Sequence, residues 1–578
     1  MKKSILYIHI TIGCLIFSGC QKLDLTPKDK VDAEIFFNTE TDLNVYTNAF
    51  YDFLPTVTNY TDDASSDNII PLTISDRVKG ARVVPAARGT GGWDWKQLRS
   101  INYFLENYHK CPDVAAKAKY SGIAKFFRAY FYYDKVKTFG DVPFYGKTLK
   151  ADDPDLYKPR DSRKLVMDSV LADIDYAIAN IPAATKLNEI TKYTALILKA
   201  RICLFEGTFR KYHNLGDHQK FLQEASTAAE ELINNSPYKL FTTGGAETAY
   251  RQLFARNDQD AVETILARDY NATFGRHNLN YLMTAPTQGA YGAPKDFIDS
   301  YLMKDGSRFT DIANYSTKEF YDEMQNRDPR LTQTIGGPNF TVYGETSREP
   351  VNLNITTTGY RVIKALGTRD QWASNSSYLD IILFRLAEAY LVFAEAKAEL
   401  ETLTQADLDK SINKLRDRVN MPHLKLADAN ANPDPYLLYY YPNVSGSNQG
   451  VILEIRRERR LELFNEGLRW DDLMRWKAGK KLEEPMVGIY FPGLGAYDFN
   501  NDGKMDVYLH NGNASGAPSG VTAIINVTQK ALTNGTSGNF FPLKATQINF
   551  NEEKDYLYPI PSEEITLNPK IIQNPKWK

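Results

Sequence analysis

The stretch EIRRERRLELFNEGLRWDDLMRW, residues 454–476, decides the fold because its charged and apolar residues recur with the period of a helix. Arginines and glutamates interleave at helical spacing: Arg456, Arg457, Arg459 and Arg460 among Glu454, Glu458, Glu462 and Glu466. An apolar face runs beside them: Leu461, Phe464, Leu468, Leu473 and Trp476. Charges at this spacing can pair along one helix. We therefore expect a structural helix here rather than a basic binding patch.

Apolar residues repeat with the same helical period in several other segments. These segments are 123–130, 170–181, 193–204, 221–232, 383–394 and, more weakly, 412–419. Turn-rich breaks separate them, and small residues mark their contact faces, as in tetratricopeptide-type helical hairpins. The expected fold is therefore mainly α, a scaffold of helical hairpins with a few short strands.

Four segments lack this period: 59–92, 271–294, 420–450 and 487–549. They are rich in turn-forming residues and long for connections inside a compact domain. Only Val507 and Leu509 alternate as in a strand. Since long loops on a rigid scaffold are where binding commonly occurs, we expect the ligand site in these segments.

The charge balance argues against nucleic acid as a partner. The 578 residues include 69 Lys and Arg against 71 Asp and Glu, a net charge of -2. Such a chain has no excess of positive charge to neutralise a polyphosphate.

The N-terminus has the pattern of a lipoprotein signal. Lys2 and Lys3 precede a mostly apolar segment, 5–17, that is too short to span a bilayer. Ser18 and Gly19 then precede Cys20, as in a lipobox. We expect residues 1–19 to be a signal peptide, Cys20 to carry the lipid, and 20–30 to be a tether to the outer membrane, with the body exposed at the cell surface. The alternative is an ordinary signal peptide with a chance cysteine.

Two cysteines remain in the body, Cys111 and Cys203. Cys203 lies in an apolar helical pattern, which indicates a buried thiol. A disulfide between the two stays open.

Motifs of catalysis are missing from the sequence. It has no HExxH or CxxC spacing for zinc, no GxSxG, and no intact phosphate-binding loop around Gly146-Lys147-Thr148. Carboxylate pairs are uninformative among 71 acidic residues. We therefore predict that the protein is not an enzyme.

One motif predicts a metal. Asp498, Asn500 and Asp502 precede Gly503 in the order D-x-N-x-D-G, which in calcium loops gathers oxygen ligands around a sharp turn. Lys504 could add its carbonyl oxygen, and Asp506 stands at the ninth position. No glutamate stands at the twelfth position. A structural Ca²⁺ is the hypothesis, and a metal-free Asp–Gly turn is the alternative.

Five segments, in this order along the chain, carry a resemblance to a known family. They are LDLTPKDKVDAEIFFNTETDLNVYTNAFYDFL (23–54), WDWKQLRSINYFLEN (93–107), FRLAEAYLVFAEA (384–396), the stretch 454–476, and YPIPSEEITLNPKIIQNPKW (558–577). Together they resemble the SusD/RagB family of outer-membrane nutrient-binding lipoproteins of Bacteroidota. Lys576 replaces the glycine usual in the last motif.

The resemblance implies a SusD-like fold with four tetratricopeptide-like hairpins. It implies an N-terminal region, 31–250, and a C-terminal region, 251–578, joined in one compact unit. It also implies that the protein binds oligosaccharide or polysaccharide and passes it to a SusC-like TonB-dependent transporter, acting as its lid. A peptide-binding member of the family, a helical-repeat scaffold without nutrient and a hydrolase are the alternatives.

Two loops fit a glycan site by composition and by their place in the family, 67–93 and 274–291. Stacking on sugar rings requires aromatic faces, and sugar hydroxyls require planar polar groups. We expect Trp93 and Tyr291 as stacking platforms and Asp67, Asn68 and Arg77 as hydrogen-bonding residues. Burial of either aromatic ring within the protein is the alternative.

Overall fold

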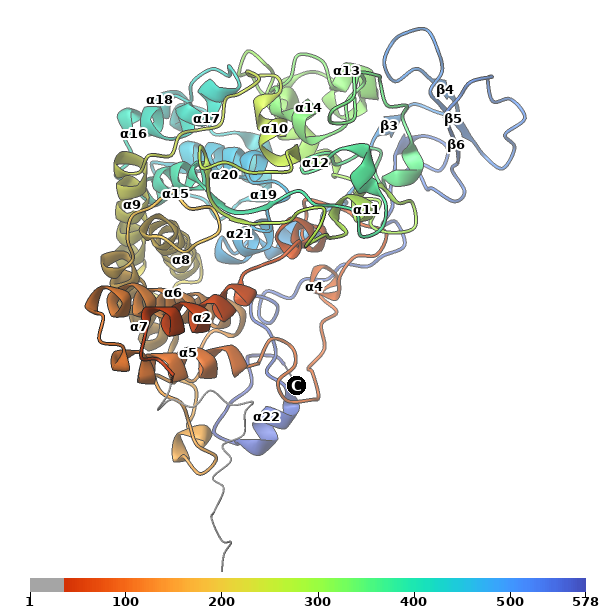
Figure 1. The fold of residues 1–578 in the computed structure, drawn as a ribbon. Coiled ribbons are helices and arrows are strands. Elements are labelled where there is room, and N and C mark those ends of the chain that lie inside the picture. Colours follow the sequence, from red (N-terminus) through yellow and green to blue (C-terminus); the bar gives the residue numbers. More distant parts are fainter. Residues whose placement is uncertain (1–35, 578) are drawn as a thin grey trace, which may run out of the picture.

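Long helices form the scaffold of the molecule. The computed structural model describes residues 36–577 and is mainly helical (Figure 1). Its longer helices are α2 (Glu40–Asn48), α5 (Lys96–Asn107), α6 (Val114–Phe139), α7 (Arg163–Asn180), α8 (Lys192–Tyr212), α9 (His218–Asn235), α15 (Leu386–Glu399) and α20 (Gln449–Glu462). Local signals set their ends: Asp113 caps α6, which stops at Gly140 in a positive-φ conformation that suits glycine. The mainly-α prediction is confirmed.

The helices pack as neighbours along the chain. α6 lies against α7 and α8 against α9, and α15 contacts both α9 and α20. These pairs are compatible with the expected hairpins. One buried core runs from Phe37 to Ile571, so residues on both sides of the expected boundary at 250 share it.

Five of the six periodic segments are helical as expected, and one needs a correction. Leu383 belongs to β2 (Ile381–Arg385), which pairs antiparallel with β1 (Thr264–Arg268), and α15 begins only at Leu386. The strand is buried along its whole length. An apolar run buried on both faces matches helix and strand spacing equally well, which explains the error.

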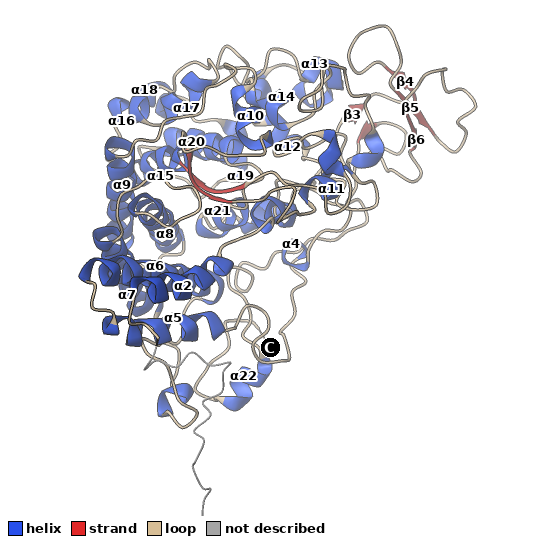
Figure 2. Ribbon diagram, in the orientation of Figure 1, coloured by secondary structure: helices blue, strands red, loops and turns tan. Residues whose placement is uncertain are grey.

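The remaining strands gather in the segment 487–549, which projects from the helical body (Figure 2). β4 (Gly495–Tyr497) pairs antiparallel with β5 (Val507–His510), and β5 pairs parallel with β6 (Ala523–Asn526). β3 (Tyr490–Phe491) pairs with β7 (Gly538–Asn539). The strand expected around Val507 and Leu509 is confirmed as β5.

Short helices also occur in the segments between the long helices and strands. They are α3 (Thr58–Thr61), α4 (Asp76–Lys79), α10 (Ala249–Ala255), α11 (Leu279–Thr284), α12 (Lys295–Asp299), α13 (Phe320–Glu323), α14 (Arg330–Thr334), α16 (Gln405–Lys410), α17 (Ile412–Arg418), α18 (Leu426–Ala431), α19 (Pro435–Tyr440), α21 (Arg469–Arg475) and α22 (Ser562–Leu567). Within residues 36–577, no helix combines the length and apolar character needed to cross a bilayer. Cys111 and Cys203 are both buried and free, so they form no disulfide.

The stretch 454–476 forms α20 and α21, but its charges do not face solvent. All six of its arginines up to Arg475 are buried: Arg456, Arg457, Arg459, Arg460, Arg469 and Arg475. The expectation that they pair along their own helix is wrong for most of them. Glu462 instead binds Arg385 at 2.7 Å and Arg418 at 2.6 Å, and Arg475 binds Glu395 at 2.5 Å.

This buried ion network ties the C-terminal helices to distant segments. Burial alone would raise the pKa of the Glu462 carboxyl, but Arg418, Arg385 and Arg330 outweigh burial and hold its pKa well below the ordinary value. Taking such a charge out of water is costly, and the three arginines around Glu462 offset that cost. The network also sets the position, on the helical body, of the segment that lies between α3 and α5.

Candidate functional site

The two loops expected to hold ligand meet on the surface of the protein. Ile70 N donates to Gly292 O at 2.8 Å, and Leu72 N donates to Gly289 O at 3.1 Å, so the loops join as a short antiparallel ladder. A β-carbon on Gly292 would lie 2.4 Å from Thr358 Oγ1, so only glycine allows this approach.

A cavity of about 640 Å³ opens between these loops, and we call it the inter-loop cavity. Its walls come from 61–79 on one side and 282–291 on the other. The lining residues are Thr61, Ala64, Ser65, Pro71, Leu72, Thr73, Ile74, Ser75, Asp76, Lys79, Leu282, Gln288, Gly289 and Tyr291. Its volume lies in the range of about 300–1,000 Å³ found for small-molecule sites. Its hydroxyl and amide groups suit a polyhydroxylated ligand.

Tyr291 is the predicted residue that the structure places in this cavity. Its side chain is 7% exposed and lines the wall beside Gly289. Burial raises the pKa of Tyr291 to about 12, so its hydroxyl stays protonated and can donate a hydrogen bond at neutral pH. The ring is more buried than a fully open stacking platform would be.

Asp67 and Asn68 lie beneath the cavity rather than in it. Both are 1% exposed. Asp67 Oδ1 accepts from Arg469 Nε at 2.7 Å, and Asn68 Oδ1 accepts from Arg460 Nε at 2.9 Å. Both side chains are therefore closed to a ligand, and the prediction that they hydrogen bond a sugar is replaced by a structural role.

Electrostatics explain why Asp67 tolerates burial. Burial alone would raise its pKa, but Arg469, Lys481 and Arg460 outweigh burial and hold the pKa well below the ordinary value. Lys481 Nζ lies 2.9 Å from Asp67 Oδ2. The loop 61–79 is thus fastened to α20 and α21 through an ionised carboxylate.

Arg77 also fastens this loop. Its Nε donates to Ser65 O at 2.8 Å, and its Nη2 donates to Asp62 Oδ2 at 2.8 Å. The guanidinium stacks over Trp470 with 4.6 Å to the ring centroid. Arg77 therefore uses its Nε and Nη2 donors within the loop, whereas the sequence had suggested this guanidinium for a sugar.

Trp93 lies in a different cavity. It is 2% exposed and packs edge-to-face against Phe139 at 4.9 Å and Trp95 at 5.4 Å. A ring this buried offers no open face to a sugar, so the stacking role expected for it is replaced by packing. The structure therefore separates the two predicted aromatic residues, since Tyr291 and Trp93 line different cavities.

Sequence reasoning found the inter-loop cavity but missed most of its lining. Leu72 is 51% exposed and lies with Thr73, Asp76 and Gln288 around the opening. Nothing in residue type distinguishes these side chains from other loop residues. Only the pairing of the two loops brings them together.

The expected calcium ligands do not share one centre. Asp498 accepts backbone N–H groups from Asp502 and Gly503, at 3.3 and 2.7 Å. Asp506 turns to Arg348, whose Nη2 lies 3.0 Å from both of its oxygens. Within residues 36–577, no group of three His, Cys, Asp or Glu side chains is arranged to hold a metal ion.

The loop 498–506 therefore has the geometry of a polar Asp–Gly turn. Asn500 Nδ2 and the backbone N–H of Lys504 both bond the carboxylate of Asp502. The donor set as folded does not fit Ca²⁺, and binding would require Asp506 to leave Arg348. The calcium hypothesis stays a prediction. Cys20, the expected lipid site, lies outside the described residues.

Comparisons with known proteins agree with this architecture. The model of the SusD family matches residues 252–577, and a second model, described as starch-binding associating with outer membrane, matches residues 50–214. A SusD-like protein of Formosa agariphila is 25% identical over 519 residues, which cover 83% of this chain and 92% of that protein. A SusD-like protein of Bacteroides ovatus is 22% identical over 612 residues, with 100% and 98% covered.

Solved structures share the fold. A SusD-like protein from Bacteroides fragilis superposes with a TM-score of 0.69 at 20% identity, covering 94% of this chain and 98% of its own. A SusD-like carbohydrate binding protein of the same species has a TM-score of 0.68 at 19% identity, with 93% and 99% covered. A structure with xylogluco-oligosaccharide has a TM-score of 0.59 at 18% identity, with 91% and 97% covered. Because the family model matches more than half of the chain, the protein belongs to the SusD/RagB family.

Proposed function

We propose that the protein binds oligosaccharide or polysaccharide at the cell surface without cleaving it. In this proposal it delivers the glycan to a SusC-like TonB-dependent transporter and acts as the lid of that transporter. Membership of the SusD/RagB family supports the ligand class, since one matching model is described as starch-binding and one similar structure holds xylogluco-oligosaccharide.

The inter-loop cavity is the observation that carries the proposal. Two long loops of unrelated sequence are held together by backbone hydrogen bonds, and the loop 61–79 is anchored through the buried carboxylate of Asp67. A site built on anchored loops loses little conformational entropy when ligand binds. The cavity offers hydroxyls, an amide and a carboxylate for sugar hydroxyls, with the edge of Tyr291 and Leu72 for the C–H faces.

The same features suit binding more than catalysis. Asp76 is the one carboxylate among the residues that line the cavity, and glycosidases of the common type use two flanking carboxyl groups. Asp76 also forms an ion pair with Lys79, at 3.3 Å.

A lipid on Cys20 is the proposed anchor. Attachment there would place the described body beyond a short tether, residues 20–30, at the outer membrane. Stable anchoring requires more than one acyl chain, which a diacylglycerol-modified cysteine provides.

Peptide binding is the nearest alternative, and a scaffold without nutrient is the next. A peptide ligand would need backbone hydrogen-bond partners along an extended groove or a free strand edge. The edges of the inter-loop ladder are partly occupied, because Gly292 also bridges to Arg361.

A binding screen tests the proposal. The full lipoprotein in detergent is offered neutral and acidic plant and algal oligosaccharides and, in parallel, peptides of mixed sequence. We expect at least one oligosaccharide to bind, with no shortening of it after prolonged incubation. Binding of peptides alone would favour the alternative, and turnover of any glycan would contradict the non-catalytic role.

A further inference from the structure

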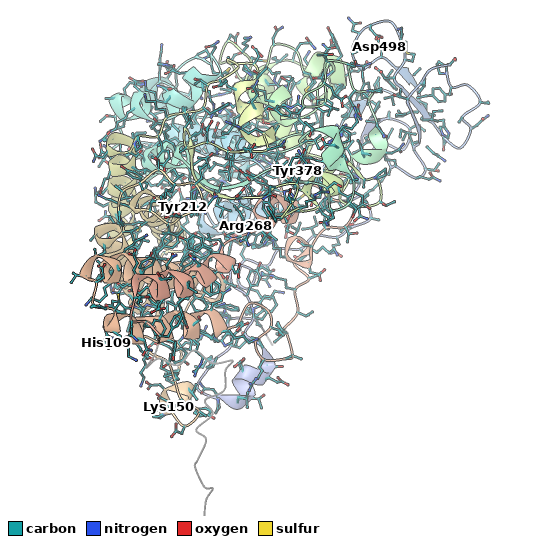
Figure 3. The ribbon with its side chains drawn as sticks, viewed as in Figure 1. His109, Lys150, Tyr212, Arg268, Tyr378 and Asp498 are labelled. Carbon is teal, nitrogen blue, oxygen red and sulfur yellow. The ribbon has the colours of Figure 1, made fainter. Side chains whose placement is uncertain are left out.

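A second cavity shares no lining residue with the inter-loop cavity, and we call it the Trp95 cavity. It measures about 660 Å³ and lies between the start of α5, the segment 143–157 and α22. α5 and α22 occupy the lower part of the view in Figure 1, beyond the helical body from β4–β6. In Figure 3, Lys150 marks this lower tip and Asp498 the opposite corner.

Aromatic rings from the start of α5 and from the segment 143–157 line the Trp95 cavity. Trp95 is half-buried, and its position is set by edge-to-face contacts with Trp93 at 5.4 Å and Tyr145 at 5.6 Å. Tyr157 stands at the end of a short 3-10 turn and is 52% exposed. Rings held by packing on one side and open on the other are the surfaces on which the C–H faces of sugars stack. Trp93 forms the closed floor beneath them.

Two guanidinium groups at this cavity have no carboxylate partner. Within residues 36–577, neither Arg88 nor Arg99 forms an ion pair, although both line the cavity. Arg99 Nη1 donates only to the carbonyl of Leu149, at 2.6 Å. A guanidinium has five N–H donors in a planar fork, so both residues keep donors for a ligand.

Most of the other charges of the cavity are matched. Lys147 lies 3.1 Å from Asp153 and 3.3 Å from Asp155, and Lys96 lies 3.9 Å from Asp94. Glu564 accepts the backbone N–H of Gly89 at 3.0 Å and has no cationic partner among the described residues. Two unpaired guanidinium groups against one unpaired carboxylate leave the lining net positive, which fits a carboxylate or sulfate.

The inter-loop cavity lacks this combination of several aromatic rings and unpaired guanidinium groups. Its arginine neighbour, Arg77, is paired with Asp62, and its lysine, Lys79, is paired with Asp76. Tyr291 is its only aromatic lining residue. The two cavities thus differ in both charge and aromatic content, which indicates different ligand groups.

We infer that the Trp95 cavity is a second saccharide site, one that takes an acidic sugar unit, a uronate or a sulfated sugar, with its anionic group on Arg88 and Arg99 and its ring against Trp95 and Tyr157. The site is separate from the inter-loop cavity, so it does not depend on where the proposed function places its glycan. An acidic polysaccharide could then contact the protein at two points.

Calorimetry with defined probes tests this inference. The full lipoprotein in detergent is titrated with tetragalacturonate, a mannuronate tetramer and a sulfated carrageenan tetrasaccharide, with cellotetraose as the neutral probe. We expect at least one acidic probe to bind and its affinity to fall with added salt, because exposed charges are screened.

Exposed residues supply the variants, so folding is not at risk. Arg88→Gln and Tyr157→Ala should each weaken binding of the acidic probe by about tenfold or more, as for other anchoring cation and stacking contacts. Lys150→Gln, a cation on the same surface segment that does not line the cavity, is the matched control and should leave binding unchanged. Leu72→Ala is measured in parallel and reports on the inter-loop cavity.

Three results would overturn the inference. They are an absence of binding by all three acidic probes, equal binding of cellotetraose, and equal affinity in the wild type and both cavity variants. Failure of the Arg88 and Tyr157 variants to hold a co-expressed transporter, without any saccharide binding, would identify a protein contact instead. Because Leu72→Ala reports on the other cavity, failure here is distinguishable from failure of the proposed function.

Discussion

At the scale of single residues, the buried carboxylates of the ion network matter most. Glu462 is fully buried and contacts Arg385, Arg418 and Arg330 from three different segments. Removing one member of such a network leaves opposite charges buried without compensation, which costs far more than the network contributes when intact. The stretch 454–476 is thus constrained by its partners rather than by its own helical spacing.

Glu462→Gln keeps the shape of the side chain and removes its charge. We expect the free energy of unfolding at pH 7 to fall by about 3–5 kcal/mol, the range for breaking a buried ion pair. Urea unfolding followed by tryptophan fluorescence measures the change. Glu553→Gln, at a side chain that is 72% exposed, is the control and should change stability by no more than about 0.5 kcal/mol.

The pH dependence of the same variant has a fixed sign. The folded-state pKa of Glu462 is depressed below its ordinary value of 4.5, so its charge stabilises the fold above that pH and loses its effect as the pH falls. The difference in Tm between wild type and Glu462→Gln should therefore shrink progressively below pH 4.5. A difference that stays constant between neutral and strongly acidic pH would contradict the assignment.

At the scale of elements, the positions of the helices could be predicted from the sequence, whereas the distant residues with which their side chains pair could not. Periodicity located α6 to α9 because each helix buries one face against its neighbours. It failed at β2, where Leu383 continues the spacing of α15 although its own segment is a strand. It also assigned the arginines of α20 to neighbours in the same helix, because residues distant in sequence, such as the Asp67 and Asp296 that pair with Arg460, are not visible as partners.

The candidate site shows the same limit. Sequence reasoning identified both loops of the inter-loop cavity and placed Tyr291 among its residues. It chose Trp93 over Trp95 as the stacking residue, whereas Trp93 is buried and Trp95, two positions later, is half-buried. Which face of a loop is buried depends on the elements that pack against it, and no local pattern records that.

The loop 498–506 gives a prediction at this scale. If it binds Ca²⁺ as its motif suggests, calorimetry should register heat, chelator should lower the Tm, and Asp498→Asn should abolish both effects. Binding would have to release Asp506 from Arg348, so Arg348→Gln should strengthen it. No heat and no shift with chelator would leave the metal-free polar turn observed here.

At the scale of the whole molecule, the protein has two cavities of different character. The inter-loop cavity carries hydroxyl and amide groups, and the Trp95 cavity carries aromatic rings and unmatched guanidinium groups. The β4–β6 segment projects from the helical body (Figure 2), and none of its residues lines either cavity. A protein that delivers a long glycan to a transporter benefits from more than one binding site, because two linked weak sites hold the glycan more tightly than either site alone.

Attachment to the membrane is a further prediction at this scale. Cys20→Ala should release the protein from the outer membrane fraction, because the proposed lipid anchor is attached to that cysteine. Fractionation followed by immunoblotting measures this. Unchanged retention in the membrane fraction, in cells that lack the transporter, would show that the anchor lies elsewhere.

The most direct test of the central claim is the affinity of the inter-loop cavity for its glycan. The oligosaccharide that binds best in the screen is titrated into wild type, Leu72→Ala, Tyr291→Ala and the control Tyr439→Ala, whose exposed ring lies outside the cavity. We predict a loss of about 1–3 kcal/mol of binding free energy for Tyr291→Ala and a smaller loss for Leu72→Ala, with the control unchanged. Unchanged affinity in both cavity variants, with native thermal unfolding, would contradict the claim.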